Sequence, residues 1–279
     1  MGLKIVTDST SDLPPRLVEE LDITVIPLIV RFGTETYRDG VDLSADEFFR
    51  KLVQGPVLPT TAAPGPAAFS EVYEKLLSQG HEVLAIHISN KLSATHGSAM
   101  LGKESLGPGR PLEVLDSTSV SMGMGLLVIQ AARAAKAGAK LAEAASLVRQ
   151  KIPVLNLYAA FDTLEYLHKG GRIGRAQALL GSVLNLKPMI VVRDGEVHPL
   201  ERVRTRAKAI GRLVELVREC PNVEELTVLH STTPDDMEDL AQRLAAIVPG
   251  RKVHRARFGP VLGTHTGPGV LGVGFLAGK

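Results

Sequence analysis

The sequence predicts an α/β fold, with a parallel-sheet α/β/α domain followed by an α+β domain that contains a mixed sheet. In the first half, short apolar runs alternate with amphipathic runs, which is the pattern of strands joined by crossover helices. In the second half, Asp194-Gly195 stands between two apolar runs and predicts a β-hairpin, which a purely parallel sheet lacks. Because Pro153 interrupts a helical pattern in a chain long enough for two domains, we expect them at residues 1–153 and 154–279.

The elements of the first domain follow from hydrophobic periodicity, capping residues and proline positions. The expected strands are residues 4–7, 23–31, 82–88 and 112–115, and the expected helices are residues 14–21, 67–78, 94–106, 121–137 and 141–151, together with one that begins at Ser44. Pro27 inside the second of these strands indicates an edge position or a bulge. Residues 34–42 are polar and are expected to form turns.

The second domain shows the same signals in a different order. The expected strands are residues 157–161, 189–192, 196–202, 226–229 and 252–257, and the expected helices are a short one around Leu164 and Leu167, then residues 205–218 and 234–247. Residues 263–269, with the sequence GTHTGPG, are expected to form a glycine-rich loop before a last apolar segment, residues 270–276.

Four junctions of the first domain are rich in hydroxyl groups. They are residues 8–11, 89–93 and 116–119, which follow predicted strands, and residues 60–61, which precede a predicted helix. Ser93 stands at the start of a predicted helix, where we expect it to act as the N-cap. Because ligands bind at the carboxyl ends of parallel strands, and helix N-termini attract anions, the junctions favour a polar anion-binding rim. Ordinary helix capping explains each junction equally well when it is taken alone.

The composition excludes several classes of protein. The chain is 44% hydrophobic and 22% charged, as is typical of a globular α/β protein. No apolar run approaches the roughly 20 residues that cross a bilayer. The one cysteine, Cys220, cannot form an internal disulfide, and the N-terminus lacks the apolar core of a signal peptide. We therefore expect a cytoplasmic protein with no stable insertion into a membrane.

The charge is small overall but unevenly distributed. The net charge is +2, while residues 1–153 carry 15 Lys and Arg against 17 Asp and Glu, and residues 154–279 carry 17 against 13. A basic face in the second half fits an acidic partner or a phosphorylated ligand, or else a solvated surface with scattered ion pairs. Since aromatic residues make up only 4% of the chain, a nucleic-acid regulator is the weakest functional hypothesis, and we expect no nucleic-acid partner.

The sequence contains no familiar motif for a nucleotide, a metal or a hydrolytic nucleophile. The Walker motif, the nucleophile elbow and the HExxH zinc motif are absent, and Val128 replaces the third glycine of a dinucleotide fingerprint that would start at Gly123. We therefore expect no cofactor and no metal, and we assign no catalytic residue. A triad of Ser93, His265 and Asp8 stays open as the basis of an alternative function, a hydrolase or transferase acting on acyl or phosphoryl groups.

Two further residues are candidates for binding. His265 lies among glycines and threonines, where it either donates a hydrogen bond to an anionic head group or bonds within its own loop. Arg172 follows two glycines, and it either binds an anion or a partner, or pairs with Glu165 or Asp162.

Eight stretches, in order and spread over nearly the whole chain, resemble the DegV family of fatty-acid-binding proteins. They are VTDSTSDLP (6–14), PTT (59–61), SNKLSATHGSA (89–99), LDSTSVSMGMG (115–125), TLEYLHKGGRIG (163–174), LNLKP (184–188), RVRTRAKA (202–209) and GTHTGPGVLGVGF (263–275). The resemblance implies a two-domain bacterial lipid carrier with an acyl-chain tunnel between its domains. Such a carrier binds a long-chain fatty acid such as palmitate and is not itself an enzyme.

The resemblance also implies partners and site residues. The carrier presents the carboxylate to a fatty acid kinase, then carries the acyl-phosphate towards an acyltransferase of phospholipid synthesis. Thr61 and Ser93 match the residues that hold the carboxylate. The other matched positions are His265, Thr60, Ser9, Ala94, Gly171 and Arg172 near the ligand, and Arg172, Arg202 and Arg204 on the kinase-docking surface. Ala94 departs from the family pattern, which has glycine at this position.

Overall fold

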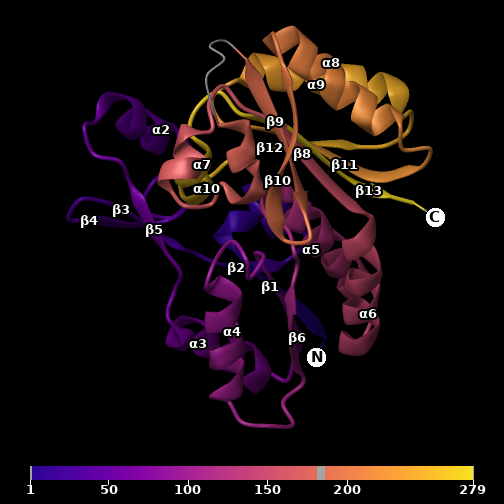
Figure 1. Ribbon diagram of the computed structural model, residues 1–279. Helices are drawn as coiled ribbons and strands as arrows, with labels where there is room; N and C mark the ends of the chain where they lie inside the picture. Colours follow the sequence, from indigo (N-terminus) through magenta and orange to yellow (C-terminus); the bar gives the residue numbers. More distant parts are fainter. Residues whose placement is uncertain (1, 181–185, 279) are drawn as a thin grey trace.

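Two β-sheets, one parallel and one mixed, enclose helix α5 (Ser121–Lys136) between them (Figure 1). The structure is a computed structural model that describes residues 2–180 and 186–278. Helices also cover the outer face of each sheet, so the layers alternate from helix to sheet across the molecule. The predicted fold class is confirmed, whereas the domain boundary at Pro153 stays a prediction.

The parallel sheet has the strand order β2-β1-β6-β7. Its strands are β1 (Leu3–Asp8), β2 (Ile23–Ile26), β6 (Glu82–His87) and β7 (Leu112–Asp116), and the helices around it are α1 (Pro15–Glu20), α3 (Pro66–Ser78), α4 (Thr95–Glu104) and α6 (Leu141–Lys151). Helices α3 and α4 pack on one face, whereas α5 and α6 pack on the other. The alternation of side chains along each strand therefore supplies two separate apolar layers.

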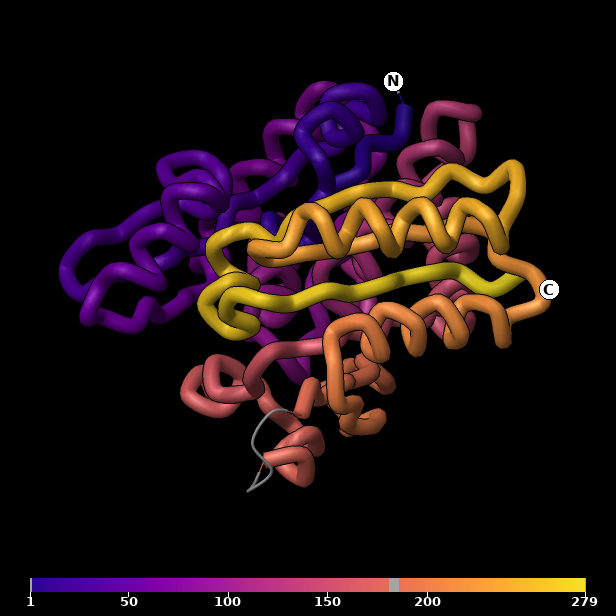
Figure 2. Tube along the Cα trace, turned by 90° about the horizontal axis from the view of Figure 1, so that it is seen from above, coloured from indigo at the N-terminus to yellow at the C-terminus, as the bar shows by residue number. Residues whose placement is uncertain are grey.

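The mixed sheet has the order β10-β9-β8-β13-β11-β12, and among these pairs only β11 and β12 are parallel. Its strands are β8 (Leu155–Ala160), β9 (Lys187–Arg193), β10 (Glu196–Val203), β11 (Val223–His230), β12 (Val253–Arg257) and β13 (Leu271–Ala277). Helices α8 (Arg206–Arg218) and α9 (Pro234–Ile247) run alongside each other over its outer face (Figure 2). The expected hairpin at Asp194-Gly195 joins β9 to β10.

A small third sheet forms a lobe on the left of Figure 1. It contains β3 (Ile29–Phe32), β4 (Glu35–Arg38) and β5 (Thr60–Ala62), and the nearby helices are α2 (Ala45–Gln54), α7 (Glu165–Lys169) and α10 (Pro260–Thr266). Three short 3₁₀ segments lie among the described residues: Ser9–Ser11, Ile152–Val154 and Gly174–Leu179. This lobe places Thr61 opposite α10, because both β5 and β3 contact that helix.

Four local predictions were wrong. Residues 23–31 form two strands in different sheets, since Pro27 has no N–H to continue a ladder. Residues 34–42 contain a strand, and residues 60–61 belong to a strand rather than a loop. Residues 263–266 are helical, so the loop begins only at Gly267. Within the LNLKP stretch, Leu184 and Asn185 lie outside the described residues.

None of the helices in the described part of the chain combines the length and the hydropathy that crossing a membrane requires.

Gly263 explains why α10 was not predicted as a helix. Its Cα faces two aromatic rings of α2, and an added Cβ would lie 2.5 Å from Phe48 Cε1 and 2.9 Å from Phe49 Cζ. A glycine that looks like a loop residue in the sequence is thus required by close packing of one helix on another.

Exchanging two helical glycines for alanine should have opposite effects. Gly263→Ala should lower the free energy of unfolding by about 1–3 kcal/mol through overpacking against the two rings. Gly211→Ala, in α8 with nothing within 4 Å of the new Cβ, should raise it by up to about 1 kcal/mol. Urea unfolding of both variants checks this, and equal effects would contradict the packing given for α10.

Candidate functional site

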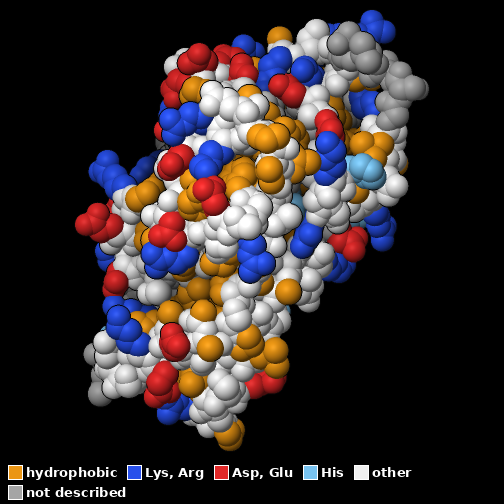
Figure 3. Space-filling model, turned by 90° about the vertical axis from the view of Figure 1, so that its left-hand side faces the viewer, with side chains coloured by type: hydrophobic (Ala, Val, Ile, Leu, Met, Phe, Trp, Pro, Cys, Tyr) orange, Lys and Arg blue, Asp and Glu red, His pale blue; other side chains and the backbone are white. Residues whose placement is uncertain are grey.

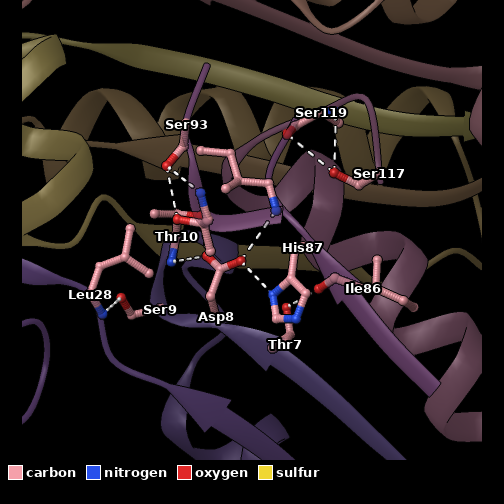
Figure 4. Close-up of polar contacts among 12 residues, drawn as sticks. Thr7, Asp8, Ser9, Thr10, Leu28, Ile86, His87, Ser93, Ser117 and Ser119 are labelled. Atoms are coloured by element: carbon pink, nitrogen blue, oxygen red, sulfur yellow. Dashed lines mark hydrogen bonds and ion pairs between the residues drawn. The ribbon is translucent and has the colours of Figure 1, made fainter. Parts of the chain in front are cut away.

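A crevice opens in the parallel sheet between the ends of β1 and β6. The chain leaves β1 towards β2 on one side, whereas β6 and β7 lie on the other side, so the loops that follow β1 and β6 diverge. Such a reversal of strand order is where open α/β sheets bind ligands. Thr10 follows β1 and Ser93 follows β6 (Figure 4), and both line the same cavity.

A buried carboxylate holds these two loops together. Asp8 accepts hydrogen bonds from the backbone N–H of Thr10 at 3.0 Å and of Ile88 at 3.2 Å, and from the Thr10 hydroxyl (Figure 4). Its Oδ2 also lies 2.9 Å from Nδ1 of His87, whose Nε2 lies 3.1 Å from the Tyr73 hydroxyl. Asp8, His87 and Tyr73 are all fully buried. Asp8, His87 and Tyr73 do not line the cavity described next, but through Asp8 the network positions two residues that do, Thr10 and Ile88.

A cavity of about 300 Å³ extends from this crevice to the inner face of the mixed sheet. Its body is apolar, formed by Leu28, Ile88, Leu92, Val120, Leu157, Ala159, Phe161, Leu167, Ile190, Val192, Val197, Leu229, Phe258, Val261 and Leu262. Its polar lining consists of Thr10, Thr61, Ser93, Ser121, Arg172, His265 and Thr266. An enclosed apolar space with a few polar groups is the usual form of a small-molecule site.

Thr61 and His265 meet in this cavity although 204 positions separate them in the chain. The Thr61 hydroxyl lies 2.9 Å from Nε2 of His265. Burial, together with the positive charge of Arg172, lowers the pKa of His265 to about 4, so the imidazole is neutral at pH 7. His265 lies in the last turn of α10, which corrects the prediction of a loop histidine.

The proton of this neutral imidazole can be assigned. Nδ1 of His265 is buried without a partner and packs against Gly170. A buried N–H without an acceptor is rarer in proteins than a buried acceptor without a donor. We therefore assign the proton to Nε2, which then donates to Thr61. The Thr61 hydroxyl proton is thereby left for a ligand atom in the cavity.

Ser93 does not act as the predicted N-cap. Helix α4 begins at Thr95 with Ala94 in the capping position, and Ser93 lies one residue earlier. Its Oγ lies 2.8 Å from the Thr95 hydroxyl and accepts a weaker hydrogen bond from the Thr95 N–H at 3.3 Å. Ser93 and Ala94 both line the cavity, so this junction is directed at the ligand space.

Arg172 contacts backbone oxygens rather than either of the carboxylates that the sequence offered. It donates to the carbonyls of Gly170 at 2.8 Å and Leu92 at 3.2 Å. Glu165 and Asp162 pair instead with lysines, at 2.5 Å and 2.7 Å. Arg172 is the only Lys or Arg among the described residues that line the cavity. Its charge is therefore available at the polar end.

Five predicted residues lie outside the cavity lining. Thr60 and Gly171 are exposed, and Ser9 accepts a hydrogen bond from the Leu28 N–H at 3.0 Å. Arg202 and Arg204 are exposed near the end of β10, where Arg202 donates to the Ala178 carbonyl at 3.2 Å.

Sequence reasoning missed three polar residues of the lining. Thr10 was within reach, since it belongs to a hydroxyl-rich junction after a strand. No sequence pattern marked Ser121 and Thr266 as cavity residues, because their position in the cavity depends on how α5 and α10 pack.

The fold and the cavity define a class: a layered α/β protein with a largely apolar cavity between the ends of a parallel sheet and the inner face of a mixed one. The chain belongs to the DegV family, because the family model described as "Uncharacterised protein, DegV family" matches residues 2–278. A DegV domain-containing protein of Deinococcus radiodurans is 39% identical over 276 residues, covering 98% of each chain.

Solved structures of other bacterial proteins resemble nearly the whole chain. A DegV family protein from Thermus thermophilus, described by its fatty acid binding, is 35% identical with a TM-score of 0.93, covering 99% of this chain and 100% of its own. A stearic acid-binding protein from Eubacterium ventriosum is 26% identical with a TM-score of 0.89, covering 99% and 98%.

The neutral state of His265 can be measured directly. Its ring resonances in an NMR titration should stay constant from pH 8 to about pH 5 and move only as the pH approaches the pKa of about 4. An ordinary histidine titrates near pH 6.5. A midpoint for His265 near 6.5 would show that the imidazole is more hydrated, and its charge better tolerated, than this geometry allows.

Proposed function

We propose that the protein binds a long-chain fatty acid such as palmitate, with the acyl chain in the cavity and the carboxylate at Thr61 and Ser93. The observation that carries the proposal is one cavity whose lining, among the described residues, is mostly aliphatic and aromatic and includes only seven polar residues, Thr61 and Ser93 among them. The fatty acids bound by the related proteins from Thermus and Eubacterium support it.

The apolar body supplies most of the binding free energy in this proposal. Each buried CH₂ group contributes about 0.8 kcal/mol, so a long chain needs only a modest polar contact to be retained. The aliphatic and aromatic walls come from the mixed sheet, from α7 and α10, and from the loops beside them. A straight hydrocarbon matches such a wall, whereas a sugar or a nucleotide would leave its polar groups unpaired.

The polar end favours a carboxylate over a cation. The hydroxyls of Thr61 and Ser93 can both donate, and the neutral imidazole of His265 orients the first of them. The guanidinium of Arg172 adds a positive charge nearby. Hydrogen bonds from these groups hold the carboxylate while one side remains free for chemistry by another protein.

We extend the proposal to a carrier role in the cytoplasm. The protein presents the carboxylate to a fatty acid kinase and carries the acyl-phosphate to an acyltransferase, with Arg172, Arg202 and Arg204 as docking residues. Lys and Arg side chains mix with Asp and Glu on the face formed by α2, the small sheet and α7 (Figure 3), which does not favour nucleic acid there.

The alternative of a hydrolase or transferase receives less support from the contacts. Asp8 is engaged with His87, whereas His265 is engaged with Thr61, so the members of the imagined triad belong to two different networks.

Removing either hydroxyl should weaken fatty acid binding. Ser93→Ala and Thr61→Val should each raise the Kd for palmitate about tenfold or more, because a hydrogen bond to a charged group contributes about 1.5–3 kcal/mol. Isothermal titration and native mass spectrometry with palmitate measure the effect.

Matched exposed variants control for general damage. Ser78→Ala on α3 and Thr36→Val on β4 delete the same groups at exposed positions and should leave the Kd unchanged. Unchanged palmitate binding in both site variants would contradict the assigned carboxylate site. A wild-type protein that takes up no fatty acid would contradict the proposed function.

The docking role predicts a separable defect. Arg202→Ala should leave palmitate affinity unchanged but lower kcat/KM of the kinase severalfold, with a smaller effect at high salt. Arg243→Ala on α9, also exposed, serves as the matched control. Equal turnover of Arg202→Ala and wild type would remove this residue from the docking surface.

A further inference from the structure

Two carboxyl groups from the first half of the chain hold the start of α10. Asp12 follows β1 and accepts a hydrogen bond from the Gly259 N–H at 2.9 Å. Asp39 follows β4, and the Val261 N–H lies close enough to its carboxyl to stabilise the ionised form. Both carboxyls lie close to Gly259, because a Cβ added there would be 3.2 Å from Asp39 Oδ1 and 3.3 Å from Asp12 Oδ1. Neither carboxyl lines the ligand cavity.

Hydroxyl groups contact both carboxyls as well, and the one on Asp12 links it to the cavity, because Ser121 lines the cavity. The Ser121 hydroxyl donates to Asp12, and the Ser9 hydroxyl donates to Asp39. Asp12 and Ser121 have φ values of +50° and +54°, a region that residues other than glycine rarely adopt. Backbone strain of this kind persists only where surrounding contacts hold it in place, and here both strained residues are bonded to each other.

Helix α10 links this pair to the ligand site. Its first turn meets Asp12 and Asp39, its middle supplies Val261 and Leu262 to the apolar wall, and its last turn carries His265. We propose that Asp12 and Asp39 are positioning residues of the ligand site, which hold one end of α10 so that His265 at the other end meets Thr61. The link to ligand affinity rests on the proposed function, whereas the hold on α10 does not.

Burial dominates the electrostatics of the pair. It raises the pKa of Asp39 to about 6 and that of Asp12 well above its ordinary value, against the opposing effect of the hydrogen bonds. The negative charge of Asp8 raises both pKa values further, and Asp39 acts on Asp12 in the same sense.

The cations around the pair are engaged elsewhere. Arg257 lines the same outer cleft but pairs with Asp46 and donates to the Ser231 carbonyl. Arg255, also in the cleft, pairs with Glu238 at 2.7 Å. Burial lowers the pKa of His230, and His265 is neutral above about pH 4. The ionised form of Asp39 thus carries a charge that hydrogen bonds alone stabilise.

The direction of the pH effect follows from linkage. With α10 in place, Asp39 binds a proton with a pKa of about 6, whereas a hydrated carboxyl has its ordinary pKa of 3.8. Protonation therefore favours the closed arrangement, and raising the pH through 6 favours local opening of α10. Between pH 5 and 7.5, these two values give about a tenfold increase in the opening equilibrium. Any ionisation of Asp12 acts in the same direction.

Hydrogen exchange in the ligand-free full-length protein tests this. After division by the intrinsic exchange rates, peptides covering residues 260–266 should exchange about tenfold faster at pH 7.5 than at pH 5. Asp39→Asn should abolish most of this ratio, because a neutral amide imitates the protonated carboxyl. Asp194→Asn, in the exposed hairpin turn, should keep the wild-type ratio. Equal ratios in Asp39→Asn and wild type would overturn the proposal.

A pair of variants separates positioning from general folding. Asp39→Ala lacks any acceptor for the Val261 N–H, so exchange in α10 should be about tenfold faster than wild type at pH 5. Because no carboxyl is left to ionise at this position, its exchange should change little between pH 5 and pH 7.5. Asp39→Asn should restore slow exchange, and exchange in α8 should be unaffected throughout. An Asp39→Ala protein with wild-type protection of α10 at pH 5 would contradict the assignment, as would an Asp39→Asn protein without rescue.

The effect on ligand binding is measured in a separate experiment, as the rate of palmitate release. Palmitate release should be faster at pH 7.5 than at pH 5 in the wild type and nearly independent of pH in Asp39→Asn. If exchange behaves as expected but release does not change with pH, the coupling of α10 to the ligand fails while its positioning stands. If no palmitate binds to any variant, the proposed function fails, and the exchange result still decides the hold on α10.

Discussion

The burial of α5 between two sheets is the constraint on which the rest of the architecture depends. A helix covered on both sides needs small residues where it approaches its neighbours most closely. Gly123 faces the Leu157 side chain of β8, and Gly125 faces the carbonyl oxygen of Ser11, with no room for a Cβ at either position. This close approach brings the start of α5 to the crevice of the parallel sheet, so Ser121 reaches both the cavity and Asp12.

The regular elements were predictable because their signals are local. Residues 141–151 and 234–247 form helices with the expected bounds, and Ser44 and Thr205 cap α2 and α8 as their positions indicated. The errors occur where contacts with residues distant in sequence determine the secondary structure. Residues 60–62 become a strand only because β3 is there to pair with them, and α10 depends on the rings of α2.

The candidate site was predictable to a similar extent and for a similar reason. Hydroxyl groups that follow parallel strands must share one edge of the sheet, which brought Ser93 and the 8–11 junction within reach of pattern reasoning. His265, Arg172 and the 60–61 junction were candidates from their local sequence, the family resemblance assigned their roles, and Thr61, His265 and Arg172 all line the cavity. The electrostatics could not be foreseen, because they depend on how deeply His265 and Asp39 are buried.

Helix α10 separates two electrostatic tasks that a single group would perform poorly. At its C-terminal end, a histidine with a lowered pKa keeps the same charge across the physiological range, so the hydrogen bond to Thr61 does not change with pH. At its N-terminal end, a carboxyl with a raised pKa changes its charge within that range. A change of pH in this range therefore acts on the carboxyls that hold the start of α10 rather than on His265 and Thr61. The hydrogen-bonding groups of the cavity keep their charge, while the position of the α10 wall can change with pH.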